Sequence, residues 1–209
     1  MQADDIVLLS STKQQIQDKT TRLDEEARRV GLKINEEKTK TMRINARNQE
    51  NIIINGQDIE DVDEFVYLGA KVCKEGGGMK DLKNRLSKAR GTFNKLKKIW
   101  ISNNISRKTK LRLYKTLVVP VLLYGSETWK MNKGDDKAVN VFHNRCLRKI
   151  FRIRWQDHVS TKELLERAGM KPLSVKVMSR RWKMIGHILR KDHTDNCNVA
   201  MSWAPEGTL

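Results

Sequence analysis

The stretch GGGMKDLKNRLSKARGTFNKLKKIW, residues 76–100, decides the fold, because the chain changes character within it. The consecutive glycines at 76–78 form a flexible joint, and we expect a domain boundary there. After the joint, apolar residues recur with the period of an amphipathic helix. These positions are Met79, Leu82, Leu86, Ala89, Phe93, Leu96 and Trp100. Residues 79–100 are therefore predicted to form a helix with one apolar face and a strongly basic remainder.

Before the joint, the sequence predicts a mixed α/β part. Residues 6–9 have the pattern of a strand, and Ser10 or Ser11 is expected to cap the following helix, with Gly31 in the left-handed conformation at its end. The apolar stripe of this helix is Ile16, Leu23, Ala27 and Val30. Extended stretches are predicted at residues 41–45, 51–54 and 65–72. Asn55-Gly56 is a strong tight-turn signal and predicts a hairpin between the isoleucines on either side.

After the joint, the pattern is almost entirely helical. Ser106 is expected to start one helix, and Pro120 to kink it. A further helix is predicted at 135–152, with an apolar stripe of Val139, Phe142, Cys146 and Ile150. A capping box at Ser160–Glu163 starts the next helix, and Pro172 precedes a basic amphipathic one. Phe93, Trp100, Phe142 and Trp182 fall on apolar stripes and are expected in the core. The residues from Asp192 onward have the pattern of a disordered tail. We predict an α+β fold, with short strands and one helix followed by a helical bundle.

Charge indicates the class of partner. The chain has 209 residues, with 42 Lys+Arg against 25 Asp+Glu and a net charge of +17. Such an excess favours a polyanionic partner, most simply nucleic acid, over an anionic membrane surface. Three scattered cysteines predict neither a disulfide framework nor a zinc pair, and no signal peptide or membrane span is visible. A nuclear or cytoplasmic location is expected.

The first residues carry a carboxylate pair, Asp4-Asp5, directly before an apolar run. Adjacent carboxylates repel each other, and a divalent cation relieves that repulsion. Mg²⁺ prefers oxygen ligands and often binds one or two carboxylates together with substrate phosphates. The alternative is a solvated turn. Zinc ligation by His187, His193 and Cys197, completed by Cys146 or His158, fits no compact spacing and is not expected.

Several segments in the same order resemble reverse transcriptases of non-LTR retrotransposons. Ala3-Asp4-Asp5 resembles the metal-binding motif of the polymerase palm, and residues 31–42 are similar to the segment after the palm helix. Residues 65–69 are similar to the hairpin that grips the primer. Residues 113–129 resemble the thumb, and residues 181–190 resemble the basic helix after it.

The resemblance implies a domain organisation and site residues. Residues 1–77 would be a partial palm, 78–154 a helical thumb, 155–191 basic post-thumb helices, and 192–209 the tail. Asp4 and Asp5 would be catalytic Mg²⁺ ligands in the full-length enzyme, Lys38 a contact for the phosphates of the incoming dNTP, and Tyr67, Leu68 and Gly69 the primer grip. The expected contacts to RNA template and DNA primer are Lys83, Arg85, Lys88, Arg90, Lys95, Lys97, Lys98, Arg180, Arg181 and Lys183.

Each of these functional assignments has a purely structural alternative. Lys38 fits an exposed loop lysine equally well, Tyr67 and Leu68 fit strand core, and the cations fit an ordinary solvated face. The family's other catalytic aspartate and its fingers have no match in these residues. We therefore expect a C-terminal fragment of an RNA-directed DNA polymerase that is inactive alone. The alternative is a non-catalytic, basic nucleic-acid-binding module derived from the thumb.

Overall fold

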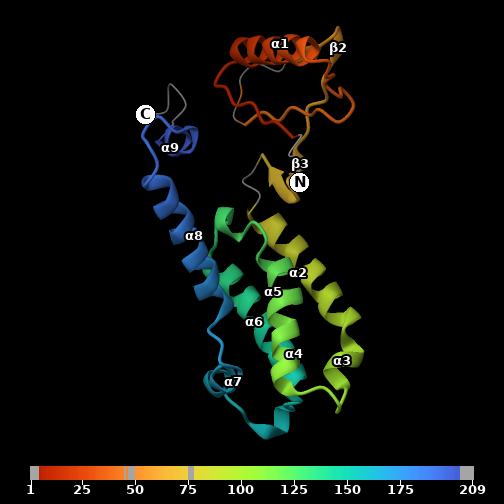
Figure 1. Ribbon diagram of the computed structural model, residues 1–209, viewed down its shortest axis with the longest axis vertical. Helices are drawn as coiled ribbons and strands as arrows, with labels where there is room; N and C mark the ends of the chain where they lie inside the picture. Colours follow the sequence, from red (N-terminus) through yellow and green to blue (C-terminus); the bar gives the residue numbers. More distant parts are fainter. Residues whose placement is uncertain (1–4, 45, 47–49, 75–77, 203–209) are drawn as a thin grey trace. The chain divides into compact units, whose positions relative to one another are not determined.

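The computed structural model describes residues 5–44, 46, 50–74 and 78–202 (Figure 1). The chain divides into two compact units, one of residues 1–77 with 201–209 and one of residues 78–200. The first unit contains a helix and short antiparallel strands, and the second consists of helices. This architecture confirms the predicted α+β class.

The first unit is organised around α1 (Lys13–Arg29). Its N-cap is Thr12, whose hydroxyl accepts from the Gln15 amide, so the predicted cap at Ser10 or Ser11 was wrong by one or two residues. Gly31 has the expected left-handed conformation, with φ +77°. The Gly31 and Leu32 amides donate to carbonyls of the last turn, which makes a Schellman ending.

Strand β1 (Ile53–Ile54) pairs with β2 (Gln57–Asp58) through the predicted Asn55-Gly56 turn. Both turn residues have positive φ, 54° and 77°. Helix α1 is joined to this hairpin by Gln17, whose side-chain amide donates to the Ile53 carbonyl at 2.8 Å and accepts from the Ile53 amide at 2.9 Å. Ile52, Ile54 and Ile59 are buried in this unit.

Two strand predictions in this unit were wrong. Described residues 5–9 have no strand, and Ile6 and Leu9 are 65% and 67% exposed. A strand needs a partner to satisfy its backbone, and no described segment pairs with this one. Residues 41–44 contribute a single parallel bridge, Thr41 with Asp61, instead of a strand.

A second hairpin consists of β3 (Glu64–Tyr67) and β4 (Ala70–Cys73), with Tyr67 opposite Ala70. The predicted single stretch at 65–72 is therefore two strands. Leu68 and Gly69 form the turn, and both have positive φ, 47° and 77°. A glycine accepts this backbone easily, whereas a leucine is strained there.

The second unit is a set of helices, in which α2 lies beside both α5 and α6 (Figure 1). In order they are α2 (Gly78–Lys95), α3 (Lys97–Ile101), α4 (Arg107–Leu113), the π-helix η1 (Tyr114–Val118), α5 (Val119–Leu123), the 3-10 helix η2 (Ser126–Thr128), α6 (Lys133–Phe151), the 3-10 helix η3 (Trp155–Asp157), α7 (Thr161–Ala168), α8 (Leu173–Leu189) and α9 (Asn196–Ser202).

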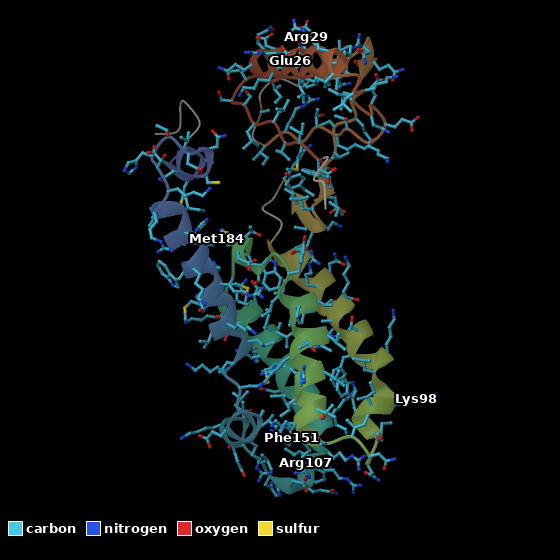
Figure 2. The ribbon with its side chains drawn as sticks, viewed as in Figure 1. Glu26, Arg29, Lys98, Arg107, Phe151 and Met184 are labelled. Atoms are coloured by element: carbon cyan, nitrogen blue, oxygen red, sulfur yellow. The ribbon has the colours of Figure 1, made fainter. Side chains whose placement is uncertain are left out.

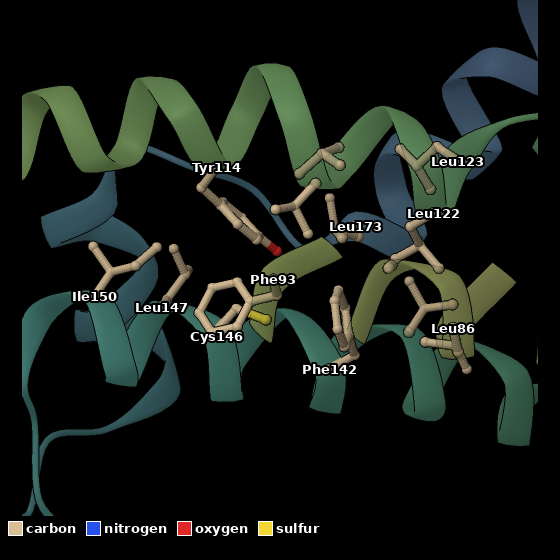
Figure 3. Packing of buried hydrophobic residues seen from close by; sticks show 14 of the residues in the cluster. Leu86, Phe93, Tyr114, Leu122, Leu123, Phe142, Cys146, Leu147, Ile150 and Leu173 are labelled. Atoms are coloured by element: carbon tan, nitrogen blue, oxygen red, sulfur yellow. The ribbon is translucent and has the colours of Figure 1, made fainter. Parts of the chain in front are cut away.

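The core of this unit lies between α2, the α4–α5 segment and α6 (Figure 3). Leu86 and Phe93 of α2 face Leu122 of α5 and Phe142 of α6. Phe93 stacks on Trp100, with ring centroids 4.9 Å apart. The predicted apolar stripes of α2 and α6 are buried at every described position except Leu96, which is half-buried where α2 gives way to α3.

Local signals set most helix boundaries as predicted. Ser106 caps α4, and Ser160 caps α7 through the Glu163 amide, although the Glu163 side chain pairs with Arg167. Pro120 cannot donate to the preceding turn, and the helix has π geometry just before it, while the kink expected at Pro120 stays a prediction.

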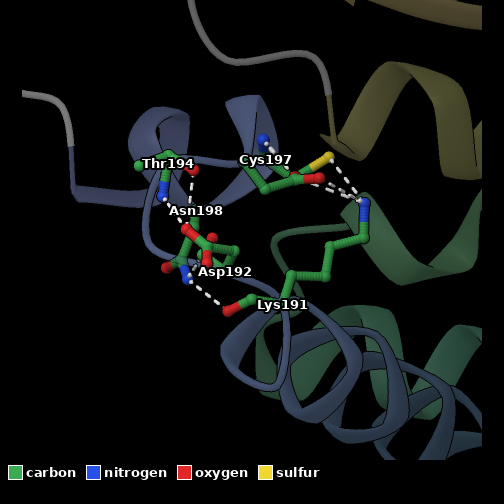
Figure 4. Close-up of polar contacts among 6 residues, drawn as sticks. Lys191, Asp192, Thr194, Cys197 and Asn198 are labelled. Carbon is green, nitrogen blue, oxygen red and sulfur yellow. Dashed lines mark hydrogen bonds and ion pairs between the residues drawn. The ribbon is translucent and has the colours of Figure 1, made fainter.

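Two predictions for the C-terminal part differ from the structure. Trp182 is 66% exposed instead of lying in the core, because the inner side of α8 is formed by Leu173, Val177 and the Arg180 contacts. In place of a tail from Asp192, the chain makes a turn and α9 (Figure 4). Asp192 accepts from the Thr194 amide and hydroxyl, and Lys191 pairs with Asp195 at 3.2 Å.

Candidate nucleic-acid interface

The carboxylate pair is only partly within the structure. Asp4 lies outside the described residues, and Asp5 is exposed. Among the residues that the structure describes, no group of three or more His, Cys, Asp or Glu side chains is placed to hold a metal ion. The assignments of Asp4 and Asp5 as metal ligands stay predictions, as does the expectation about zinc.

Lys38 lies in a turn at the start of the segment that leads to Thr41. Its amide donates to the Asn35 side chain at 2.9 Å, and the Thr39 amide donates to the Asn35 carbonyl. The turn fixes the backbone while the Lys38 side chain is exposed. This placement is compatible with both a phosphate contact and a solvated lysine.

The residues expected to grip a primer form the tip of the β3–β4 hairpin. Tyr67 is half-buried at the end of β3, and Leu68 is 42% exposed in the turn. The hairpin therefore presents Leu68 and Gly69 at its tip, with Tyr67 next to them. Leu68 held at positive φ is a local strain of the kind that concentrates at functional loops.

Most cations expected on the first helices are indeed at the surface. Lys98 projects outward from α3 (Figure 2). The exposed set is Lys83, Lys88, Arg90, Lys95, Lys97 and Lys98. None of them forms an ion pair with a carboxylate among residues 5–44, 46, 50–74 and 78–202.

Arg85 differs from this expectation, because it is 6% exposed. Its guanidinium lies over the Tyr124 ring, 4.5 Å from the centroid, and its Nε is 3.7 Å from Asp81 Oδ1. Trp129 Nε1 donates to the other Asp81 oxygen at 2.8 Å. Arg85 therefore neutralises a buried carboxylate and joins α2 to the end of α5, and is not available at the surface.

Arg180 also has a structural role. Its Nη1 donates to the Leu123 carbonyl at 2.6 Å and lies 3.4 Å from Glu127, so it anchors α8 to the end of α5 and to η2. Arg181 is half-buried, and Lys183 is exposed on the outer side of α8. Of the three cations expected here, Lys183 is the most accessible.

Helices α2 and α6 enclose a groove of about 210 Å³, which we call the basic groove. Arg90 and Asn94 of α2 line one side, and Arg145 and Lys149 of α6 line the other. Its apolar lining is Phe93, Val141, Phe142 and Cys146. Cations thus face the same groove from two helices, over an apolar floor.

Arg145 and Lys149 were missed in the sequence. They lie four residues apart on α6, beside the buried Phe142 and Cys146, and each is exposed. Their signal was the i, i+4 spacing next to the apolar stripe, which places both at its edge. Only the packing of α2 against α6 brings them opposite Arg90.

The Cys146 thiol at the base of the groove is unreactive. Burial raises the pKa of Cys146 to about 12, against the opposing effect of the charges on Lys149 and Arg90. A thiol that stays protonated is neither a nucleophile nor a metal ligand. The chemistry that the groove offers is therefore electrostatic, namely attraction of phosphate groups by arginine and lysine.

No helix in the described part of the chain is long and apolar enough to cross a membrane. Residues 92–124 match a domain of unknown function, DUF6451. No solved structure matches the chain.

Two comparisons bear on identity. Residues 2–72 match the reverse transcriptase (RNA-dependent DNA polymerase) family. A transposon-derived protein of Caenorhabditis elegans is 26% identical over 213 residues, covering 97% of this chain and 75% of that protein. The family match includes Ala3-Asp4-Asp5, residues 31–42 and residues 65–69, so the resemblance seen in the sequence is confirmed there. Residues 2–72 are thus similar to a segment of a reverse transcriptase domain, within a chain that is similar along its length to a transposon-derived protein.

Proposed function

We propose that the chain is the C-terminal part of a non-LTR reverse transcriptase, in which the helical unit binds the duplex of RNA template and DNA primer. Residues 1–77 would supply the end of the palm, 78–154 the thumb, and 155–191 the basic helices after it. The observation that carries this proposal is the basic groove, where Arg90 faces Arg145 and Lys149. No carboxylate occurs in the described lining of the groove.

The expected mode of binding follows from the chemistry of these groups. Arginine and lysine attract phosphates of any sequence, so affinity is expected to depend strongly on salt and weakly on base sequence. The exposed cations of α2 and α3 extend the same charge along the unit. Cations without competing carboxylates repel one another, and phosphates would relieve that repulsion.

The test is a binding titration of the 209-residue protein with an RNA–DNA primer–template, repeated at rising salt. The charge reversal Arg145→Glu should lower affinity at every salt concentration and reduce the slope of log K against log salt by about 1. The matched control is Lys162→Glu, an exposed lysine on α7 outside the groove. A flat salt response, or equal loss in both variants, would refute the proposed interface.

Catalysis is the second part of the proposal. We expect these 209 residues alone not to extend a primer, because Asp5 is exposed and the described residues contain no cluster of three or more side chains placed to hold a metal ion. Mg²⁺-dependent extension is assigned to a complete domain, where carboxylates of other palm strands would join the pair. The alternative function, a non-catalytic binding module, predicts the same binding.

A primer-extension assay with dNTPs and Mg²⁺ separates the possibilities. The expected result is binding without extension. Extension that disappears in the Asp4→Asn variant would overturn the expectation of inactivity. Extension by a longer polypeptide that joins further palm strands to residues 1–209, but not by 1–209, would favour the polymerase over the stand-alone module.

A further inference from the structure

The outer face of α8 has a composition that the proposed duplex binding does not use. We call it the Trp182 face and define it by Ser179, Trp182, Lys183, Gly186, His187 and Arg190, which line an open groove on this helix. The spacing of three and four residues places them all on one side of α8. The opposite side of the helix is occupied, since Leu173 and Val177 are buried and Arg180 binds the Leu123 carbonyl.

Two kinds of side chain flank the groove. On one flank, Met178, Trp182 and Leu189 are 53%, 66% and 58% exposed. On the other flank lie Lys183 and Arg190, both exposed. Ser179 and Gly186 separate the flanks, and their small size leaves the groove open.

Trp182 stands apart from the buried tryptophans. Trp100 and Trp129 are 4% and 2% exposed, and each indole N–H has a hydrogen-bond acceptor, the Phe93 carbonyl and Asp81 respectively. Trp182 contributes little to the core because most of its surface is exposed. Proteins that bind single-stranded nucleic acids use such an exposed aromatic ring to stack on a base, with neighbouring cations that contact the phosphates.

Gly186 supports a role for the open groove. Glycine in a helix interior costs about 1 kcal/mol relative to alanine, so a packing or binding reason is expected for it. A Cβ on Gly186 would lie 3.3 Å from Arg190 Nη1. The absence of a side chain therefore lets the Arg190 guanidinium lie back along the helix, next to the groove.

We propose that the Trp182 face binds single-stranded nucleic acid, with Trp182 stacking on a base and Lys183 and Arg190 contacting the flanking phosphates. The α8 sequence contains no Asp or Glu, which suits a polyanion. A single strand fits better than a duplex, because the base faces of a duplex are already stacked and cannot receive an indole. A membrane fits less well, because the broad apolar side of α8 is already buried against the bundle.

This inference deepens the proposed nucleic-acid function and concerns a different surface, so its failure can be separated from failure of the basic groove. The experiment measures affinity of the 209-residue protein for a thymidylate or uridylate homopolymer about 20 nucleotides long, and in parallel for a blunt-ended RNA–DNA duplex without single-stranded overhangs. Trp182→Ala is expected to weaken single-strand binding about 10-fold, as loss of one stacked base predicts, and to leave duplex binding unchanged.

Three controls sharpen the test. Trp155→Ala removes another exposed tryptophan, 80% exposed in η3, and should leave single-strand affinity unchanged. Trp182→Phe keeps an aromatic face and should retain most of the affinity. Gly186→Ala places a Cβ 3.3 Å from Arg190 Nη1, which a shift of a few tenths of an ångström in this flexible side chain relieves, so single-strand affinity should stay nearly unchanged. Thermal unfolding of each variant checks that the fold is intact.

The Trp182 face and the basic groove can be refuted separately. Single-strand affinity that Trp182→Ala leaves unchanged, or lowers no more than Trp155→Ala does, would overturn the Trp182 face. The same follows if Trp182→Ala abolishes binding to vesicles containing phosphatidylserine but not to the homopolymer. If Arg145→Glu fails to alter duplex binding while Trp182→Ala lowers single-strand binding, the basic groove is wrong and the Trp182 face stands.

Discussion

The pH dependence of stability should report the burial of one side chain, His143 on α6. Its ring is fully buried, and its Nδ1 is 2.8 Å from the Tyr114 hydroxyl. The two rings also stack, with centroids 5.7 Å apart. Burial lowers the pKa of His143 from 6.5 to about 4, and the charge on Lys176 acts in the same direction. The folded protein therefore keeps this imidazole neutral in a pH range where the unfolded chain protonates it.

The size and sign of the effect follow from that difference. Between pH 6.5 and about 4, the unfolded chain binds one proton at this site that the folded protein does not. The free energy of unfolding is therefore highest above pH 6.5 and falls as the pH is lowered through this window. At 1.36 kcal/mol per pKa unit, the loss attributable to His143 is about 3 kcal/mol by pH 4, with little further change below.

The assay is urea unfolding at a series of pH values, for the wild type and for His143→Asn. Asparagine keeps an oxygen toward the Tyr114 hydroxyl and does not titrate, so the carboxylates that protonate in the same range cancel in the comparison. The variant should be less stable near neutral pH, because it is smaller, and the two proteins should converge in stability as the pH falls to about 4. A constant difference across the pH series would refute the reasoning.

Three further substitutions have defined consequences. Asp81→Ala should cost about 3–5 kcal/mol in urea unfolding, because it leaves Arg85 charged and buried and Trp129 without its acceptor; a loss below 1 kcal/mol would mean that Arg85 finds solvent. Leu68→Asn should stabilise the β3–β4 hairpin by up to about 1 kcal/mol, seen as slower amide exchange there, since asparagine accepts positive φ; faster exchange would contradict the strain. Gly125→Ala should destabilise the second unit by about 1–2 kcal/mol in thermal unfolding because Gly125 has φ +70°, and an unchanged midpoint would show that the backbone relaxes.

Several features could be predicted because their causes are local. Asn55-Gly56 makes its turn because both residues tolerate positive φ, and Gly31 ends α1 for the same reason. Ser106 caps α4 because its hydroxyl reaches the Thr109 amide. The buried stripe of α2 followed from spacing alone. In each case a few neighbouring residues contain all of the information.

Other features depend on partners that are distant in sequence. Residues 6–9 are apolar, and Ile6 and Val7 are β-branched, but nothing in the run says whether a strand will pair with it. The basic groove exists because α6 packs against α2, and the sequence cannot place Arg145 opposite Arg90. Arg85 had a local clue, since Asp81 lies four residues before it, but its burial comes from Tyr124 and Trp129 on another segment. The roles of Asp5, Lys38 and the hairpin tip stay predictions.

Net charge overstates how many cations are available to nucleic acid. Lys110 is buried and donates to the Trp100 and Ser102 carbonyls at 3.0 and 2.6 Å, and Arg152 donates to the Ile101 carbonyl nearby, so both cations stabilise the C-terminal end of α3. Arg148 is similarly bonded to the Val159 carbonyl at 2.8 Å. These cations are bonded to carbonyls of the fold, and phosphates cannot reach the buried Lys110 without breaking it. The salt dependence of duplex binding should therefore reflect only the exposed cations, and a slope that approached the full excess of Lys and Arg would mean that binding opens the helical unit.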